Sequence, residues 1–241
     1  MSQFSNLRAV FLNCSLKAMN NTSHTQKLME RSIHIMRTEG INVESIHMRN
    51  YNVMFGMTMD ASTNNEKDDW PDIQKKIIAA DILVIGSPIW LGIQSSVASL
   101  AIERMYSYSS EVNEKGQYVY YGKVGGCLVT GNEDGVKHVA RDILYSLQHI
   151  GFTIPPQADA GWIGEIGPGP SYGDKLPEAA VDSSGIGYAS EFTNKNTTYM
   201  TWNLMHLAKL LKDNGGIPAK GNNSDWKSVN NATDISPATL G

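Results

Sequence analysis

The sequence predicts an α/β protein built on a doubly wound, five-stranded parallel sheet. Strand-like apolar segments alternate four times with amphipathic helical segments, an order that requires parallel strands and right-handed crossovers. The clearest strand, Ile82 to Ile85, is an unbroken run of β-branched residues and leucine, which is typical of a strand covered on both faces. Three unusual loops follow strands, and such sheets bind ligands at the carboxyl ends of their strands.

The first strand, Arg8 to Asn13, leads through a long polar turn into a helix that Gly40 ends. The turn is rich in hydroxyl and amide side chains and also carries Lys17 and His24. Free N–H groups and the positive end of the helix dipole make such a turn suited to a phosphate. Helix capping by Ser23 explains part of this composition but does not require so long a polar run, so we favour an anion site.

The next unit begins with an edge strand, Asn42 to Met48, followed by an irregular stretch and a helix that starts near Trp70. The third strand, Asp81 to Ile85, then runs into Gly86-Ser-Pro-Ile-Trp-Leu-Gly92, where glycine, serine and proline argue against a regular element. The large apolar side chains of that loop suggest a flat, apolar ligand lying against them. A loop that packs on its own domain explains them equally well.

A third helix runs to about Tyr108, and the fourth strand, Lys123 to Val129, ends in Thr130-Gly-Asn-Glu-Asp-Gly135. A strongly amphipathic helix follows from Val136, and Phe152 to Ile154 is expected to form a short fifth strand. We expect one domain over residues 1–241, and its parts are a core over about 7–155, a covering loop over 156–192, a C-terminal helix over 195–214 and a tail over 215–241.

Composition excludes several classes of protein. The net charge is −4, from 20 basic and 24 acidic residues mixed along the chain, which gives no electrostatic footprint for nucleic acid or for a membrane surface. The longest apolar runs have the length of strands and residues 1–6 do not resemble a signal peptide, so we expect a cytoplasmic protein. Cys14 and Cys127 are expected to be buried hydrophobes, and no histidine or cysteine spacing predicts a metal site.

The three loops together describe the site of a mononucleotide with a flat ring. The first loop suits a phosphate, the second offers aromatic and apolar groups, and the third is small and polar. Flavin mononucleotide (FMN) fits this combination best. No Gly-x-Gly-x-x-Gly follows the first strand and no Walker phosphate loop occurs, which disfavours a dinucleotide site and a nucleotide triphosphatase.

The same three segments resemble the flavin loops of a known family. They are Asn13-Cys-Ser-Leu-Lys17 with Ser23-His-Thr25, Gly86 to Gly92, and Thr130 to Gly135, and the family is that of the flavodoxin-like NAD(P)H-dependent FMN reductases. The resemblance covers about residues 7–155. It implies the flavodoxin-like strand order 2-1-3-4-5, FMN as a bound cofactor, NADH or NADPH as co-substrate, and a homodimer or homotetramer. The long loop insertion departs from the shortest members of the family.

The resemblance also implies which residues contact FMN. The phosphate contacts would be Ser15, Lys17, Ser23, His24 and Thr25. The ring would be bordered by Pro88, Ile89, Trp90, Leu91 and Gly92, and the site would be completed by Thr130, Gly131, Asn132, Glu133, Asp134 and Gly135. A contact between Tyr172 and the flavin is a separate hypothesis.

The function expected on this basis is an FMN-dependent oxidoreductase. It would take a hydride from NAD(P)H and pass electrons to a quinone, a free flavin or a similar small acceptor. No catalytic side chain is expected, because the flavin carries the chemistry. Two alternatives stay open, a flavodoxin-like electron carrier and a non-enzymatic FMN-binding protein, since a fold alone does not fix a function.

Overall fold

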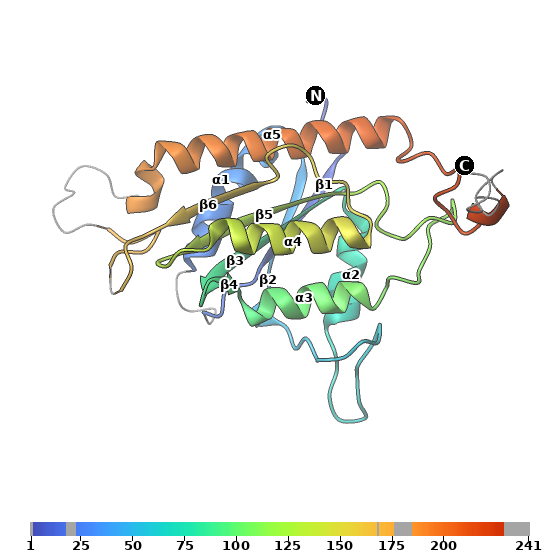
Figure 1. Cartoon of the computed structure of the whole chain (residues 1–241), viewed down its shortest axis with the longest axis horizontal. Helices are drawn as coiled ribbons and strands as arrows, with labels where there is room; N and C mark the ends of the chain where they lie inside the picture. Colours follow the sequence, from blue (N-terminus) through green and yellow to red (C-terminus); the bar gives the residue numbers. More distant parts are fainter. Residues whose placement is uncertain (1, 18–22, 168, 176–184, 229–241) are drawn as a thin grey trace, which may run out of the picture.

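The computed structural model describes residues 2–17, 23–167, 169–175 and 185–228 (Figure 1). The strands are β1 (Arg8–Asn13), β2 (Asn42–His47), β3 (Ile82–Trp90), β4 (Ile93–Gln94), β5 (Val124–Gly131) and β6 (Asp159–Ile163). The helices are α1 (His24–Thr38), α2 (Trp70–Ala79), α3 (Ser96–Tyr106), α4 (Val136–Ile150) and α5 (Glu191–Asp213). Short 3-10 turns are η1 (Met48–Asn50), η2 (Ile186–Ala189) and η3 (Trp226–Ser228).

Five of these strands form a parallel sheet in the order β2-β1-β3-β5-β6. The two-residue strand β4 pairs antiparallel with the end of β3 and lies off this path. In the register of the sheet, Ala9 lies opposite Ile82, and Val84 lies opposite Gly126, so β3 is the central strand. The predicted flavodoxin-like order is therefore confirmed, with β5 and β6 as the fourth and fifth strands of the sheet.

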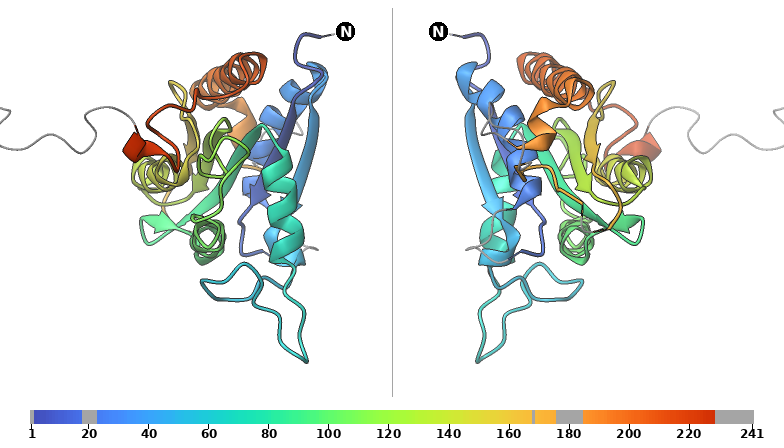
Figure 2. Two further views of the ribbon diagram at one scale, coloured as in Figure 1. Left: turned by 90° about the vertical axis from the view of Figure 1, so that its right-hand side faces the viewer. Right: turned by 90° about the vertical axis from the view of Figure 1, so that its left-hand side faces the viewer.

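Helices cover both faces of the sheet, with α2, α3 and α4 on one face and α1 and α5 on the other (Figure 2). Alternate residues of β3 supply the two cores, since Leu83 and Ile85 pack on the first face and Ile82 and Val84 on the second. These four side chains are no more than 1% exposed, and burying each one stabilises the fold by roughly 1.5–3 kcal/mol. A strand covered on both faces is what the sequence predicted.

β3 continues beyond its predicted end, and the expectation of an irregular segment from Gly86 onwards is wrong. The strand runs to Trp90, paired with β5 as far as Pro88 and then with β4. β1 ends at Asn13, opposite Gly86, so the last part of β3 has a parallel neighbour on one side only, a position that tolerates proline. Gly86 serves close packing instead, because a Cβ there would lie 2.3 Å from the Sδ atom of Met29 in α1.

The fifth strand also differs from the prediction. Thr153 makes a single isolated bridge to Val124, and the strand itself is β6, which lies within the predicted covering loop. The two prolines at 155 and 156 interrupt the pairing between these segments. Gly161 in β6 marks close packing rather than a loop, because a Cβ there would lie 2.6 Å from Cγ1 of Val136.

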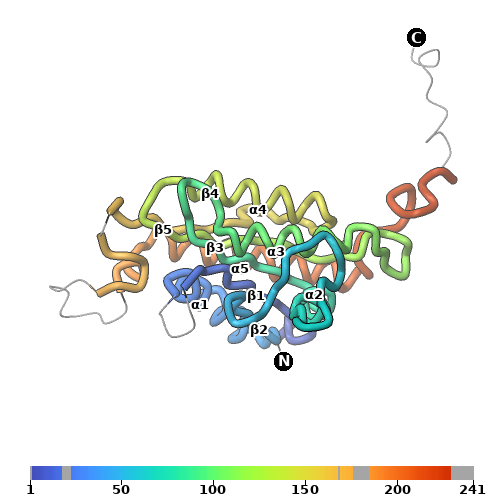
Figure 3. The backbone as a smooth tube through the Cα atoms, turned by 90° about the horizontal axis from the view of Figure 1, so that it is seen from below, coloured from blue at the N-terminus to red at the C-terminus, as the bar shows by residue number. Residues whose placement is uncertain are grey.

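α5 starts earlier than the predicted residue 195. The Ser190 hydroxyl caps the helix by accepting the backbone N–H of Thr193, so the first turn forms from Glu191. The residues that follow α5 lie at the end of the molecule opposite β4, where Ser224 donates its backbone N–H to the carbonyl of Gly116 at 2.8 Å (Figure 3). No helix within the described ranges has the length and apolar character to cross a membrane.

Residues 51–69 form a loop that projects below α2 (Figure 2). A buried ion pair anchors the loop, since Arg104 of α3 lies 2.6 Å from Asp68 and both side chains are 0% exposed. Asp68 also accepts the backbone N–H groups of Met54 and Ala61, and Arg104 donates to the carbonyl of Met54 at 2.7 Å. Burial alone would raise the pKa of Asp68, but these hydrogen bonds and Arg104 hold it below its usual range.

Candidate functional site

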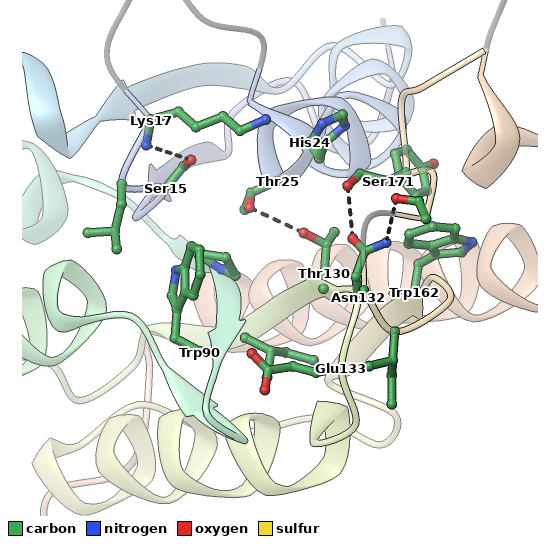
Figure 4. A pocket seen from close by; sticks show the side chains of 18 residues that line it. Ser15, Lys17, His24, Thr25, Trp90, Thr130, Asn132, Glu133, Trp162 and Ser171 are labelled. Atoms are coloured by element: carbon green, nitrogen blue, oxygen red, sulfur yellow. Dashed lines mark hydrogen bonds between the residues drawn. The ribbon is translucent and has the colours of Figure 1, made fainter. Parts of the chain in front are cut away.

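A cavity of about 550 Å³ opens at the carboxyl ends of β1, β3 and β5, where parallel sheets bind ligands (Figure 4). Its wall consists of Ser15, Leu16, Lys17, His24, Thr25, Pro88, Ile89, Trp90, Thr130, Gly131, Asn132, Glu133, Trp162, Ile166, Gly167, Gly169, Ser171 and Tyr172. The three loops singled out from the sequence are therefore neighbours in space, and residues beyond β6 complete the wall.

Polar and cationic groups gather at the end of the cavity next to α1. Asn13 shapes the backbone there, because its Oδ1 accepts the N–H of Ser15 at 3.0 Å and its Nδ2 donates to Ser23 at 3.3 Å. Lys17 and His24 lie on the same side of the cavity as the start of α1 (Figure 4). A cationic side chain beside the N–H groups of a helix N-terminus is an arrangement that suits a phosphate.

His24 has a defined protonation state. Its Nδ1 accepts the backbone N–H of Gly173 at 3.0 Å and so carries no proton, while its Nε2 faces Asp174 at 3.7 Å. Burial and the charge of Lys17 lower the pKa of His24 from its ordinary value of 6.5; Asp174 opposes this effect and Lys27 adds to it. At neutral pH the ring is therefore uncharged and carries its proton on Nε2.

Aromatic and apolar groups border the rest of the cavity. Trp90 of β3 and Trp162 of β6 stand on opposite sides of it (Figure 4). Trp90 is 52% exposed, whereas its neighbour Ile89 is buried in the core. Between the two walls the buried hydroxyls of Thr25 and Thr130 lie 3.3 Å apart. A flat ring joined to a polar chain matches this order of groups.

Most of the residues predicted from the sequence meet at this cavity. They are Ser15, Lys17, His24, Thr25, Pro88, Ile89, Trp90, Thr130, Gly131, Asn132, Glu133 and Tyr172. The predicted residues outside its wall are Ser23, Leu91, Gly92, Asp134 and Gly135.

Four of the five residues outside the wall have a visible structural role. Ser23 caps α1 by accepting the N–H of Gln26 at 3.1 Å, and Asp134 accepts the N–H of Gly135 at 2.7 Å. Gly92 and Gly135 bring two loops into backbone contact, since a Cβ on Gly135 would lie 2.9 Å from the Gly92 carbonyl oxygen. The Leu91 side chain is 90% exposed at the tip of the β3–β4 hairpin.

Sequence reasoning missed Leu16 in the first loop and, apart from Tyr172, the side of the cavity formed by residues beyond β5. The residues concerned are Leu16, Trp162, Ile166, Gly167, Gly169 and Ser171. Five of these six belong to the stretch from Gly161 to Gly173, where a tryptophan, two isoleucines and a tyrosine lie among glycines and prolines. Large apolar residues in such a loop indicated a covering segment, but they did not indicate which face of the sheet it covers.

Comparison with known proteins identifies relatives of this arrangement. The family described as NADPH-dependent FMN reductase matches residues 7–162. The chain is 33% identical over 213 residues to 8-demethyl-8-aminoriboflavin-5'-phosphate synthase from Streptomyces davaonensis, covering 86% of this chain and 79% of that protein. It is also similar to the crystal structure of RosB with a bound intermediate, 8-demethyl-8-formylriboflavin-5'-phosphate, with 33% identity and a TM-score of 0.74 over 86% of this chain and 81% of that one.

A further relative is much longer than this chain. It is the divalent metal cation transporter MntH from Mycobacterium bovis, strain ATCC BAA-935 / AF2122/97, with 51% identity over 211 residues. The match covers 87% of this chain, which spans only 30% of the length of that protein. The family match extends over more than half of the chain and covers the strands of the sheet up to the last residue but one of β6. The chain therefore belongs to the NADPH-dependent FMN reductase family.

Proposed function

We propose that the 550 Å³ cavity is the FMN site, with the phosphate at the end that holds Lys17 and His24. The observation that supports this most is that Lys17, the N-terminus of α1 and two tryptophans border one cavity of a size suited to such a ligand. When bound, FMN supplies the redox chemistry, accepting a hydride from NAD(P)H and giving electrons to a second substrate.

In this proposal the side chains bind and orient. Ser15, Lys17 and the Nε2–H of His24 hold the phosphate by hydrogen bonds and charge.

Trp90 and Trp162 form the walls beside the ring, and the Thr25 and Thr130 hydroxyls face the polar chain between ring and phosphate. Tyr172, which is 0% exposed and packs edge to face on Trp162 at 5.7 Å, keeps water out of that side.

The acceptor is proposed to be a small, flat molecule such as a quinone or a free flavin. Trp90 supports this, because half of its surface is open at the cavity mouth and offers a stacking surface. A ferric chelate is a further candidate, because the 51%-identical relative is named a divalent metal cation transporter. The two electrons of one hydride would reduce two ferric ions to the divalent state.

The first test is the visible spectrum of the purified protein before and after anaerobic addition of NADH or NADPH. Flavin absorption that bleaches with a nicotinamide supports the reductase, and a benzoquinone, free riboflavin and a ferric chelate are then compared as acceptors. Flavin absorption that resists both nicotinamides favours an electron carrier. A protein that neither contains nor takes up FMN contradicts the assignment of the cavity.

Trp90→Ala tests the wall beside the ring. We expect weaker FMN binding or slower acceptor turnover, because base or ring stacking on an aromatic side chain contributes roughly 1–3 kcal/mol. Trp226→Ala is a matched control, since Trp226 is similarly exposed, at 45%, and lies after α5. If the two variants behave alike, Trp90 does not border the flavin.

A second candidate function is the modification of the flavin itself. It rests on the similarity to a synthase of 8-demethyl-8-aminoriboflavin-5'-phosphate and to RosB with a formylated riboflavin-5'-phosphate bound. In that case FMN would be a substrate as well as a cofactor. Mass spectrometry of the flavin released after incubation with FMN and candidate amino donors separates the two functions, because a reductase returns FMN of unchanged mass.

A further inference from the structure

Asn132, in the loop after β5, fastens a segment from the other side of the cavity. Its Nδ2 lies within donating distance of three backbone carbonyls, at 3.2 Å from Glu165, 3.3 Å from Gly169 and 3.0 Å from Pro170. Its Oδ1 accepts the hydroxyl of Ser171 at 2.8 Å. Figure 4 shows this amide between the end of β5 and the segment beyond β6. We call residues 164–167 and 169–174 the cover segment.

The start of the cover segment packs tightly against Asn132. The backbone N–H of Gly164 donates to the carbonyl of Gly131 at 2.8 Å. A Cβ on Gly164 would lie 2.6 Å from Asn132 Nδ2 and 2.6 Å from the indole of Trp162. The glycine is therefore what allows the segment to approach the amide so closely.

The far end of the cover segment is fastened to α1. Gly173 donates its N–H to His24, as described above, and its carbonyl accepts from Nζ of Lys27 at 2.9 Å. Between the two fastened ends, the segment supplies Ile166, Ser171 and several of the other residues that form the cavity wall. Its position therefore decides whether that side of the cavity is closed.

The hydrogen bonds of Asn132 leave little capacity for a ligand. A primary amide has two N–H donors, and three carbonyl oxygens already surround them. The carbonyl oxygen of the amide is engaged by Ser171. The resemblance to FMN reductases implied a direct flavin contact at this position. In the structure, however, the Asn132 amide makes its hydrogen bonds to other groups of the protein.

We propose that Asn132 is a positioning residue, which holds the cover segment as a wall of the cavity and slows the departure of FMN through that wall. The hydrogen bonds of Asn132 are enough to support its attachment to the cover segment, whereas its effect on FMN rests on the proposed function. Asn132 would thus act on the cofactor without touching it.

Asn132→Asp tests the proposal, because the side chain keeps its shape but loses both donors and places a carboxylate against three carbonyl oxygens. Hydrogen exchange of the Gly164 amide is measured in the flavin-free protein, and the FMN dissociation rate is measured in the loaded protein. We expect each rate to rise by about tenfold or more, the factor that corresponds to the loss of one to two hydrogen bonds.

Two further variants make the comparison specific. Ser171→Ala removes one bond to Oδ1 and should shift both rates in the same direction but less, which also keeps the test available if the aspartate variant fails to fold. Asn203→Asp is a matched control, since Asn203 is partly exposed and donates to the Pro156 carbonyl at 2.8 Å, away from the cavity wall. It should leave both rates unchanged.

The outcomes separate the proposal from its alternatives. Faster FMN loss with unchanged exchange at Gly164 would mean a direct flavin contact by Asn132 and would overturn the proposal. Faster exchange with unchanged FMN loss would overturn the retaining role. If the wild-type protein binds no FMN at all, the proposed function fails and the retaining role with it, while exchange at Gly164 still decides whether Asn132 fastens the segment.

Discussion

The backbone N–H of Leu91 donates a hydrogen bond to Oε1 of Glu133 at 3.0 Å, which ties the β3–β4 hairpin to the loop after β5. Leu91 and Gly92 form the two-residue turn of this hairpin, with φ of +53° and +76°. Positive φ at both positions is the pattern of a type I′ turn, in which asparagine followed by glycine is preferred. A leucine there is strained, and with 90% of its side chain exposed it gains little packing in return.

Replacing Leu91 with asparagine should therefore stabilise the protein, by about 1 kcal/mol in the free energy of unfolding. Urea denaturation of the flavin-free protein measures this. Gly92→Ala is the opposite control and should destabilise by a similar amount, because it adds a Cβ at positive φ. Equal denaturation midpoints for Leu91→Asn and the wild type would show that contacts of the leucine offset the strain.

Acidification should loosen the end of the cover segment that His24 holds. The pKa of His24 is lower in the folded protein than in the unfolded chain, so between these two values the unfolded chain binds more protons. The contribution of His24 to stability is thus present above pH 6.5 and is lost as the pH falls through the folded-state pKa. Protonation of Nδ1 would also place two donors, the ring and Gly173 N–H, against each other.

The measurement is the urea midpoint of flavin-free protein between pH 7 and pH 5. His24→Asn removes the titration while keeping an acceptor near the position of Nδ1, so the fall in midpoint should be shallower in this variant than in the wild type. Parallel curves for the two proteins would mean that the imidazole does not carry the effect.

The ion pair between Asp68 and Arg104 should be among the most sensitive sites in the chain. Asp68→Asn leaves a guanidinium buried without its counter-charge, which typically destabilises a protein by about 3–5 kcal/mol. Asp72→Asn is the matched control, since this aspartate is 55% exposed and solvent screens its ion pairs with lysines, so its loss should change the free energy of unfolding little. Thermal or urea unfolding should show a large loss for the first variant, and similar losses for both would contradict the role of burial.

Gly86→Ala should destabilise by about 1–3 kcal/mol, because the new methyl group overlaps Met29 and approaches Cγ2 of Thr25 at 3.0 Å. α1 would have to move away from β3, and with it the threonine that lines the cavity. A double-mutant cycle with Met29→Ala checks the cause. The combined change should lose less stability than the sum of the two single changes, and simple additivity would exclude a clash at Met29.

Periodicity along the chain predicted the helices and the central strands well, because those elements owe their formation to local pattern and to burial on one or two faces. The run from Ile82 and the helix from Val136 are examples. Prediction failed where the structural role of a residue depends on a contact with a part of the chain that is distant in sequence. Gly86 and Gly161 signalled loops in the sequence, but each is needed because α1 or α4 approaches a strand closely.

The residues of the candidate site show the same difference between roles that local sequence predicts and roles that depend on distant contacts. The polar turn after β1 and the tryptophan at the end of β3 were found because their residue types are unusual for their places in the sequence. Asn132 was found by position but given a different role, since its four partners lie 33 to 39 residues further along the chain. No local pattern reveals contacts of that kind.

The anchored loop of residues 51–69 has a consequence for association with other molecules. At its outer part Phe55 and Met57 are 83% and 59% exposed, yet the backbone nearby is held by the ion pair of Asp68 and Arg104 within the core. The conformational entropy of this loop is therefore lost when the chain folds and not when another molecule binds to the loop. A molecule that covers these two side chains would bind a surface already in its final shape.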